Sequence, residues 1–117
     1  MGAQQFVTKS AGSNVDDAFK QACAWARYAY GSDGYTGSIA EKDNYVLFDV
    51  PTGTTAEEFA ELIAEAEWSS AGRESLADLI GGEDVQHVVD AFANKWGPAV
   101  ALRVSEGEWL FCGWASS

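Results

Sequence analysis

The sequence predicts a single α+β domain, residues 1–117, in which a four-stranded, mainly antiparallel sheet carries helices packed on one face. Its length is that of one domain. Short segments rich in β-branched and aromatic residues are set apart from longer segments whose apolar residues recur every three or four positions. The last two strand segments are joined by a short turn that contains glycine, which is typical of an antiparallel hairpin. The predicted order is β-α-β-α-α-α-β-β.

The first part of the chain predicts a strand and a long helix. Weak alternation over Gln5–Lys9 predicts the strand. Ser13 and Asp16 have the spacing of a capping box and predict the start of a helix over Val15–Tyr30. Gly31 is expected to end this helix, because glycine adopts positive φ without strain. The apolar stripe of the helix consists of Val15, Phe19, Ala22, Cys23 and Ala26.

The middle of the chain predicts one strand and three helices. The strand covers Asn44–Val50 and ends at Pro51. Thr55 and Glu58 form a second capping-box pair, and the helix behind it turns Phe59, Leu62, Ile63 and Ala66 inward. A short helix is expected over Glu74–Ile80. A further helix, Glu83–Trp96, carries the stripe Val85, Val88, Val89, Phe92 and Trp96.

The C-terminal segments Ala99–Val104 and Trp109–Ala115 predict the closing hairpin.

Charge is the most unusual property of the chain, with 18 acids against 7 bases and a net charge of −11. This balance argues against direct nucleic-acid binding and against an anionic membrane surface. It favours a basic protein partner, or it serves solubility alone. With no apolar run of about 18 residues and no signal-peptide pattern at the N-terminus, we expect a cytoplasmic protein.

The acids gather in the predicted middle helices. Residues 57–90 contain ten acids and one base, Arg73. Glutamates without basic neighbours at i±4 repel one another, so this face is either a solvated surface or a docking surface for a basic partner. One version of docking is mimicry of DNA by carboxylates. The candidate residues are Glu57, Glu58, Glu61, Glu65, Asp84 and Asp90.

Two strands are apolar on both faces, which gives a second candidate surface. If helices cover only one face of the sheet, side chains of these strands are exposed and imply self-association or a protein partner. The alternative is a central strand buried on both faces. The candidate residues are Tyr45, Leu47, Trp109 and Phe111.

The glycine-rich segment between Tyr30 and Lys42 gives a third candidate, a ligand-binding loop. Glycine-rich turns with a hydroxyl group can bind anions through backbone N–H groups. The segment lacks the Gly-Lys-Ser/Thr ending of a P-loop. The alternative is a structural loop with Tyr35 packed into the core. The candidate residues are Tyr30, Asp33, Tyr35, Thr36, Glu41 and Lys42.

The same segment carries a resemblance. Tyr30-Gly31-Ser32-Asp33-Gly34-Tyr35-Thr36-Gly37-Ser38-Ile39-Ala40-Glu41-Lys42 resembles a YGxxGYTGTIAEK-like segment in small proteins of actinobacteria and their bacteriophages. Ser38 stands where that segment has Thr. The resemblance implies a phage or actinobacterial cytoplasmic protein and brings no catalytic residues with it.

No catalytic motif is present in the sequence. His87, the single histidine, has Asp84 and Asp90 three residues away on either side, which makes a poor zinc site, and an exposed histidine is the alternative. Cys23 and Cys112 are expected to be free buried thiols, with a disulfide as the alternative. We therefore expect no cofactor, no metal site and no enzyme activity.

These features lead to one main functional hypothesis. The chain is a non-enzymatic, phage-encoded module that docks onto a host or phage protein, in host takeover or anti-defence. The alternatives are a small-molecule-binding protein or enzyme that uses the Tyr30–Lys42 loop, and a DNA-mimic inhibitor of a nucleic-acid-binding protein. A homodimer formed through the aromatic strand is a further alternative.

Overall fold

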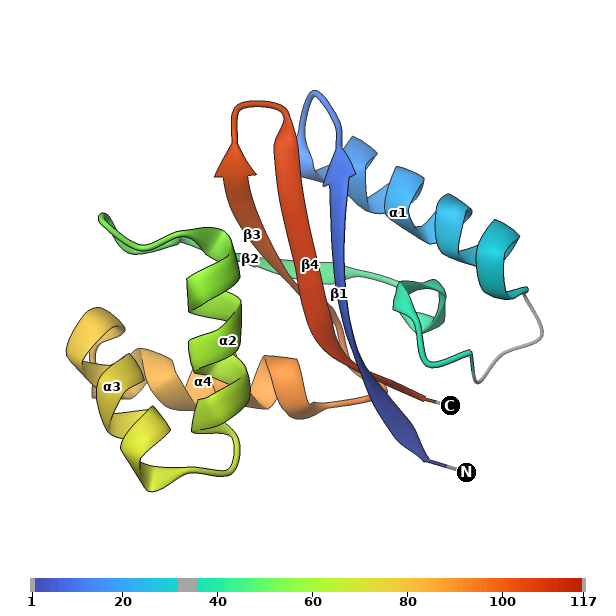
Figure 1. Ribbon diagram of the computed structural model, residues 1–117. Coiled ribbons are helices and arrows are strands. Elements are labelled where there is room, and N and C mark those ends of the chain that lie inside the picture. The colour runs from blue at the N-terminus through green and yellow to red at the C-terminus, as the bar shows by residue number, and fades with distance from the viewer. Residues whose placement is uncertain (1, 32–35, 117) are drawn as a thin grey trace.

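A computed structural model describes residues 2–31 and 36–116 and shows a sheet held between two layers of helices (Figure 1). The predicted α+β class and the predicted order of elements are confirmed. The elements are β1 (Ala3–Ala11), α1 (Val15–Tyr30), the 3-10 helix η1 (Ile39–Glu41), β2 (Tyr45–Phe48), α2 (Ala56–Ala66), α3 (Ser70–Ile80), α4 (Gly82–Ala93), β3 (Ala99–Ser105) and β4 (Glu108–Ser116).

The four strands form a mixed, mainly antiparallel sheet in the order β1-β4-β3-β2. β4 pairs with β1 and with β3 in the antiparallel sense, and β2 pairs with β3 in the parallel sense. Parallel neighbours cannot be joined by a tight turn. The chain therefore returns from β2 to β3 through α2, α3 and α4.

The predicted packing of helices on one face holds for α2, α3 and α4, whereas α1 covers the opposite face (Figure 1). The topology explains this division, because the connection from β1 to β2 crosses the sheet in one direction and that from β2 to β3 returns in the other, and right-handed crossovers of opposite direction lie on opposite faces. The connection that contains α1 must cross the whole sheet. Alternate residues of β3 serve the two cores. Val100 and Leu102 face α2–α4, and Ala99 and Ala101 face α1.

β4 is apolar on both faces because it lies inside the sheet with helices on either side. Leu110 and Cys112 pack against α2–α4, whereas Phe111 and Ala115 pack against α1. A strand buried on both faces is typically apolar throughout. The central-strand interpretation of this pattern is thus the one that the structure supports.

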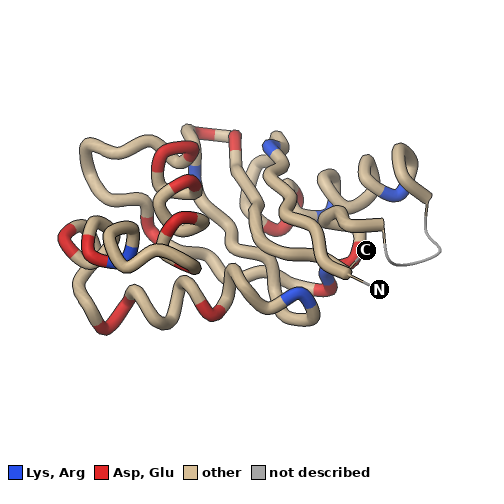
Figure 2. Tube along the Cα trace, turned by 60° about the horizontal axis from the view of Figure 1, so that its bottom comes forward, with Lys and Arg blue, Asp and Glu red and all other residues tan. Residues whose placement is uncertain are grey.

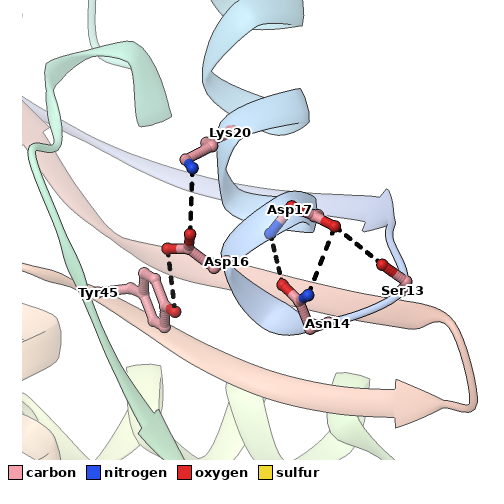
Figure 3. Close-up of polar contacts among 6 residues, drawn as sticks. All are labelled: Ser13, Asn14, Asp16, Asp17, Lys20 and Tyr45. Atoms are coloured by element: carbon pink, nitrogen blue, oxygen red, sulfur yellow. Dashed lines mark hydrogen bonds and ion pairs between the residues drawn. The ribbon is translucent and has the colours of Figure 1, made fainter.

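The start of α1 differs in detail from the prediction (Figure 3). Asn14 is the N-cap in place of Ser13, and its side chain accepts a hydrogen bond from the Asp17 backbone N–H at 2.9 Å. The Ser13 hydroxyl donates to the Asp17 carboxylate at 2.8 Å. Asn and Ser are nearly equal as N-caps, so residue type does not decide between neighbouring candidates. The predicted stop at Gly31 is confirmed by its φ of 92°.

Two helix boundaries shift in the middle of the chain. α3 begins four residues before the predicted Glu74, because Ser69 caps it by accepting from the Gly72 N–H at 3.2 Å. α4 ends at Ala93, so Trp96 is not part of its inward stripe and is exposed. The Thr55 cap of α2 is confirmed, with the Glu58 N–H donating to its hydroxyl at 3.1 Å. Within the described residues, none of these helices is long and apolar enough to cross a membrane.

Candidate protein-binding surfaces

The first candidate surface is the acidic layer, which we define as helices α2–α4 with the ten acids between Glu57 and Asp90. Figure 2 shows these acidic positions spread over the three helices, with basic positions largely elsewhere. The six candidate side chains, Glu57, Glu58, Glu61, Glu65, Asp84 and Asp90, are all exposed. The buried sides of the same helices carry an ordinary core that includes Phe59, Ile63, Leu76, Val88 and Phe92. The packing of the layer therefore directs its acids to solvent, except Glu67, which is half-buried and accepts a hydrogen bond from the Trp114 indole N–H at 2.6 Å.

Few of these acids have a cationic partner. In residues 2–31 and 36–116, Glu57 alone of the ten forms an ion pair, with Lys9 of β1 at 2.9 Å. The hydrogen bond in this pair raises the pKa of Lys9 and lowers the pKa of Glu57. Arg73, the one base of the layer, donates to Gln86 at 3.0 Å. The Gln86 amide in turn donates to Asp90 at 2.7 Å. Most of the negative charge is left uncompensated.

The second candidate surface, on the aromatic strands, is largely internal. Phe111 is fully buried, and its ring contacts Phe19 and Tyr45 with centroids 5.5 and 6.1 Å apart. The Tyr45 hydroxyl donates to Asp16 of α1 at 3.5 Å (Figure 3). Burial and the Asp16 carboxylate raise the pKa of this tyrosine. Trp109 is half-buried against the same core. Of the four candidates only Leu47 is exposed, so they form no continuous surface patch.

The third candidate, the Tyr30–Lys42 loop, is tied together by its own side chains. The Thr36 hydroxyl donates to Glu41 at 2.7 Å and lies 2.8 Å from the Ser38 hydroxyl. The Ser38 side chain accepts from the Ala40 N–H at 3.2 Å and so caps the short helix η1. Tyr30 is exposed, whereas Asp33 and Tyr35 lie outside the described residues. The hydroxyl groups expected to bind an anion are engaged within the segment.

Lys42 is also engaged inside the protein, at a place far away in the sequence. Its ammonium group donates to the carbonyl oxygens of Asn94 and Gly97 at 3.0 Å each and of Lys95 at 3.4 Å. These carbonyls belong to the turn that directly follows α4. The side chain is only 2% exposed, and burial lowers its pKa to about 8. Lys42 thus holds the turn after α4 against the segment that follows η1.

The histidine and the cysteines show no assembled reactive centre. His87 is exposed, and its ring lies 5.4 Å from that of Phe48. Among the residues that the structure describes, no three His, Cys, Asp or Glu side chains are grouped to hold a metal ion. Cys23 and Cys112 are buried free thiols in cores on opposite faces of the sheet, which rules out the alternative disulfide. Burial raises the pKa of Cys112 to about 12.

The structure reveals a surface that the sequence analysis missed, along the edge strand β1. A groove of about 690 Å³ runs between β1 and α1, and Trp25 and Tyr30 of α1 are part of its lining. These two rings are 5.9 Å apart and nearly perpendicular, and both are more than half exposed. Trp25 lies outside the predicted apolar stripe of its helix, which is the one signal for this surface that the sequence contains.

Comparison with known proteins adds no relative to this picture: no family model, no curated protein and no solved structure matches the chain.

Proposed function

We propose that the protein is a non-enzymatic binding module whose acidic layer docks onto a basic surface of a protein partner. The observation that carries this proposal is the exposed charge of the layer, in which ten acids and one base have a single ion pair among the described residues. Like charges at i, i+4, such as Glu61 and Glu65, destabilise a helix. A basic partner would relieve this repulsion on binding, whereas solvent and salt only screen it.

The negative charge of the acidic layer should also speed association with a basic partner. A surface dominated by one sign of charge attracts an oppositely charged partner over distance and raises the rate of association. The proposal includes the case in which the partner's basic surface is a nucleic-acid-binding site, so that the carboxylates stand in for phosphates. A phage origin and a role in host takeover remain predictions from the resemblance of the Tyr30–Lys42 segment.

The ligand-binding alternative has less support. Thr36, Ser38 and Glu41 bond to one another, and Lys42 is directed at backbone carbonyls rather than at solvent. A ligand at this loop would have to displace these contacts.

The proposal is tested by reversing charge at Glu61 and Glu65, whose carboxylates form no hydrogen bond or ion pair within the described residues. Glu57 and Glu58 are unsuitable, since the first pairs with Lys9 and the second belongs to the α2 cap. We expect the double variant Glu61→Lys/Glu65→Lys to lose a partner that the wild-type protein captures from host lysate, as identified by mass spectrometry. Its thermal unfolding should remain cooperative, because both side chains are exposed.

A matched control changes the net charge equally at sites outside the acidic layer. Asp49→Lys/Glu106→Lys also replaces two exposed acids, and this variant should retain the partner. Equal capture by the wild-type protein and by Glu61→Lys/Glu65→Lys would rule out docking through this part of the layer. Competition with duplex DNA then distinguishes the mimicry version, because only a nucleic-acid-binding partner is released by DNA.

A further inference from the structure

β1 is an open sheet edge without the usual protection. It has nine residues, and in the described part of the chain β4 is the only strand that pairs with it. Natural edge strands are commonly shortened or interrupted by proline, bulges or several charges, which prevent pairing with another chain. β1 contains no proline, its register with β4 is regular over nine pairs, and its one charged residue is Lys9. The ammonium group of Lys9 is already bound to Glu57.

On the side of the groove, the surroundings of this edge are apolar or uncharged, whereas on the other face Glu57 and Glu108 lie near Lys9. Val7, at the middle of β1, is 63% exposed, and Trp25 and Tyr30 beside the groove are 58% and 59% exposed. The remaining lining consists mostly of small or uncharged polar residues, and Lys9 is its only charged member. On its groove side, a protein of net charge −11 therefore presents an edge without acids, at which a second molecule with the same charge is not repelled locally.

We infer that this edge binds the same edge of a second copy of the chain, so that two β1 strands pair antiparallel around a two-fold axis at Val7. Such a pair joins the two sheets into one sheet of eight strands. The interface is isologous, as in most homodimers. It satisfies the outward backbone groups of β1 and buries the exposed Val7, Trp25 and Tyr30 side chains at least in part.

The sequence of β1 fits this register along its whole length. With Val7 opposite Val7 of the partner subunit, all nine residues from Ala3 to Ala11 are paired. Lys9 then lies opposite Gln5 of the partner subunit, so that no two like charges meet across the pair. Phe6 lies opposite Thr8 of the partner subunit, and the central pair joins two β-branched side chains, which favour strands.

The two-fold axis also determines where the helices of the two copies lie. An axis perpendicular to the sheet keeps both α1 helices on one face, where Trp25 and Tyr30 of each copy line a shared groove. Both acidic layers then lie on the other face. This inference does not depend on the proposed function. If both are correct, the dimer presents two acidic layers in the same direction, and binding to a partner with two basic sites gains from avidity.

Light scattering and sedimentation equilibrium of the purified chain test the inference, over roughly 1–200 μM at physiological salt, a range in which a micromolar dimer dissociates. We expect a dimer at the upper end. Val7→Lys places two ammonium groups opposite each other at the axis and should weaken the dimer at least about tenfold. Val7→Glu should do the same. An equimolar mixture of the two variants should restore a dimer, because opposite charges then meet at the axis.

Leu47→Lys is the matched control, since Leu47 is an exposed apolar residue on β2 at the opposite edge of the sheet. This variant should remain dimeric, as should Glu61→Lys/Glu65→Lys. A wild-type protein that stays monomeric over the whole range overturns the inference. So does a dimer that persists in Val7→Lys, a dimer that is lost in Leu47→Lys, or a mixture of the two Val7 variants that stays monomeric.

Discussion

At the scale of single residues, Lys42 shows how a charged side chain can belong to the interior. A buried ammonium group is tolerated only when its donors are satisfied, and its three N–H groups meet three backbone carbonyls. Lys42 thereby connects the segment after η1 to the end of α4, 52 residues further along the chain.

Replacement of Lys42 should lower the free energy of unfolding and change how that free energy depends on pH. Lys42→Met keeps an apolar stem but leaves the carbonyls without their donor, so we expect the free energy of unfolding to fall by roughly 2–4 kcal/mol near neutral pH. The folded-state pKa of about 8 lies below the ordinary value of 10.5. Between these values the unfolded chain binds more protons, so the stability contributed by Lys42 rises with pH across this interval and is constant below it.

The measurement is chemical denaturation of the wild-type protein and the variant at several pH values from roughly 7 to 10. The difference between the two proteins should widen above pH 8. Other titrating groups, including the thiol of Cys112, occur in both proteins and cancel in the difference. A constant difference at all pH values would show that burial does not shift the pKa of Lys42.

At the scale of elements, the acidic layer depends on a close approach of α2 and α3. Gly72 of α3 faces the end of α2, and a Cβ atom at this position would lie 2.8 Å from the Glu65 carbonyl carbon and 3.0 Å from the Ala66 nitrogen. Both atoms belong to the backbone, so they cannot turn aside as a flexible side chain can. Glycine is therefore required by packing in the first turn of α3, at a helical position where alanine is otherwise preferred.

This packing reverses the usual effect of glycine replacement. Gly72→Ala would ordinarily stabilise a helix by about 0.5–1 kcal/mol. Here we expect a loss of roughly 1–3 kcal/mol in the free energy of unfolding, because the two helices must move apart. Ser75→Ala, at an exposed position of the same helix, is the control and should be neutral or slightly stabilising. If Gly72→Ala raises the denaturation midpoint, the close approach of α2 and α3 is wrong.

At the scale of the whole molecule, charge and burial are distributed unequally around the sheet. The acidic layer covers one face, α1 covers the other, and the groove between β1 and α1 has Lys9 as the one charged residue of its lining. Of the two aromatic strands that predicted a binding surface, β4 lies inside the sheet, whereas β2 is a short edge strand on which Leu47 is exposed. The two surfaces proposed here for partners are the outside of the acidic layer and the edge of β1.

The unequal charge should make the stability of the protein depend on salt. The Debye length falls from about 30 Å at 0.01 M to about 3 Å at 1 M, so repulsion within the acidic layer is screened as salt is added. We expect the free energy of unfolding to rise by about 1–2 kcal/mol over this range in potassium chloride. In Glu61→Lys/Glu65→Lys the free energy of unfolding should rise less with salt than in the wild-type protein. An equal rise would mean that the repulsion does not come from Glu61 and Glu65.

The sequence by itself determined the features that depend on near neighbours. The bounds of α1, its stop at Gly31, the Thr55 cap and the order of elements follow from residues within one or two helical turns of one another. The gathering of acids between residues 57 and 90 is likewise a property of the sequence alone. The prediction of Ser13 as the N-cap of α1 was wrong, because the adjacent Asn14 is equally suitable by residue type.

Only the tertiary structure decided which strand lies inside the sheet and which lies at its edge. That choice depends on the pairing of β1 with β4, whose partners Ala3 and Ser116 stand at opposite ends of the described chain. Periodicity reports how many faces of a strand are apolar but not what covers them. It therefore could not distinguish a buried Phe111 from an exposed one, nor reveal that Val7 and Trp25 border an open edge. The contact of Lys42 with the end of α4 is equally non-local, because the lysine and its three carbonyls meet only when the sheet and both helix layers are assembled.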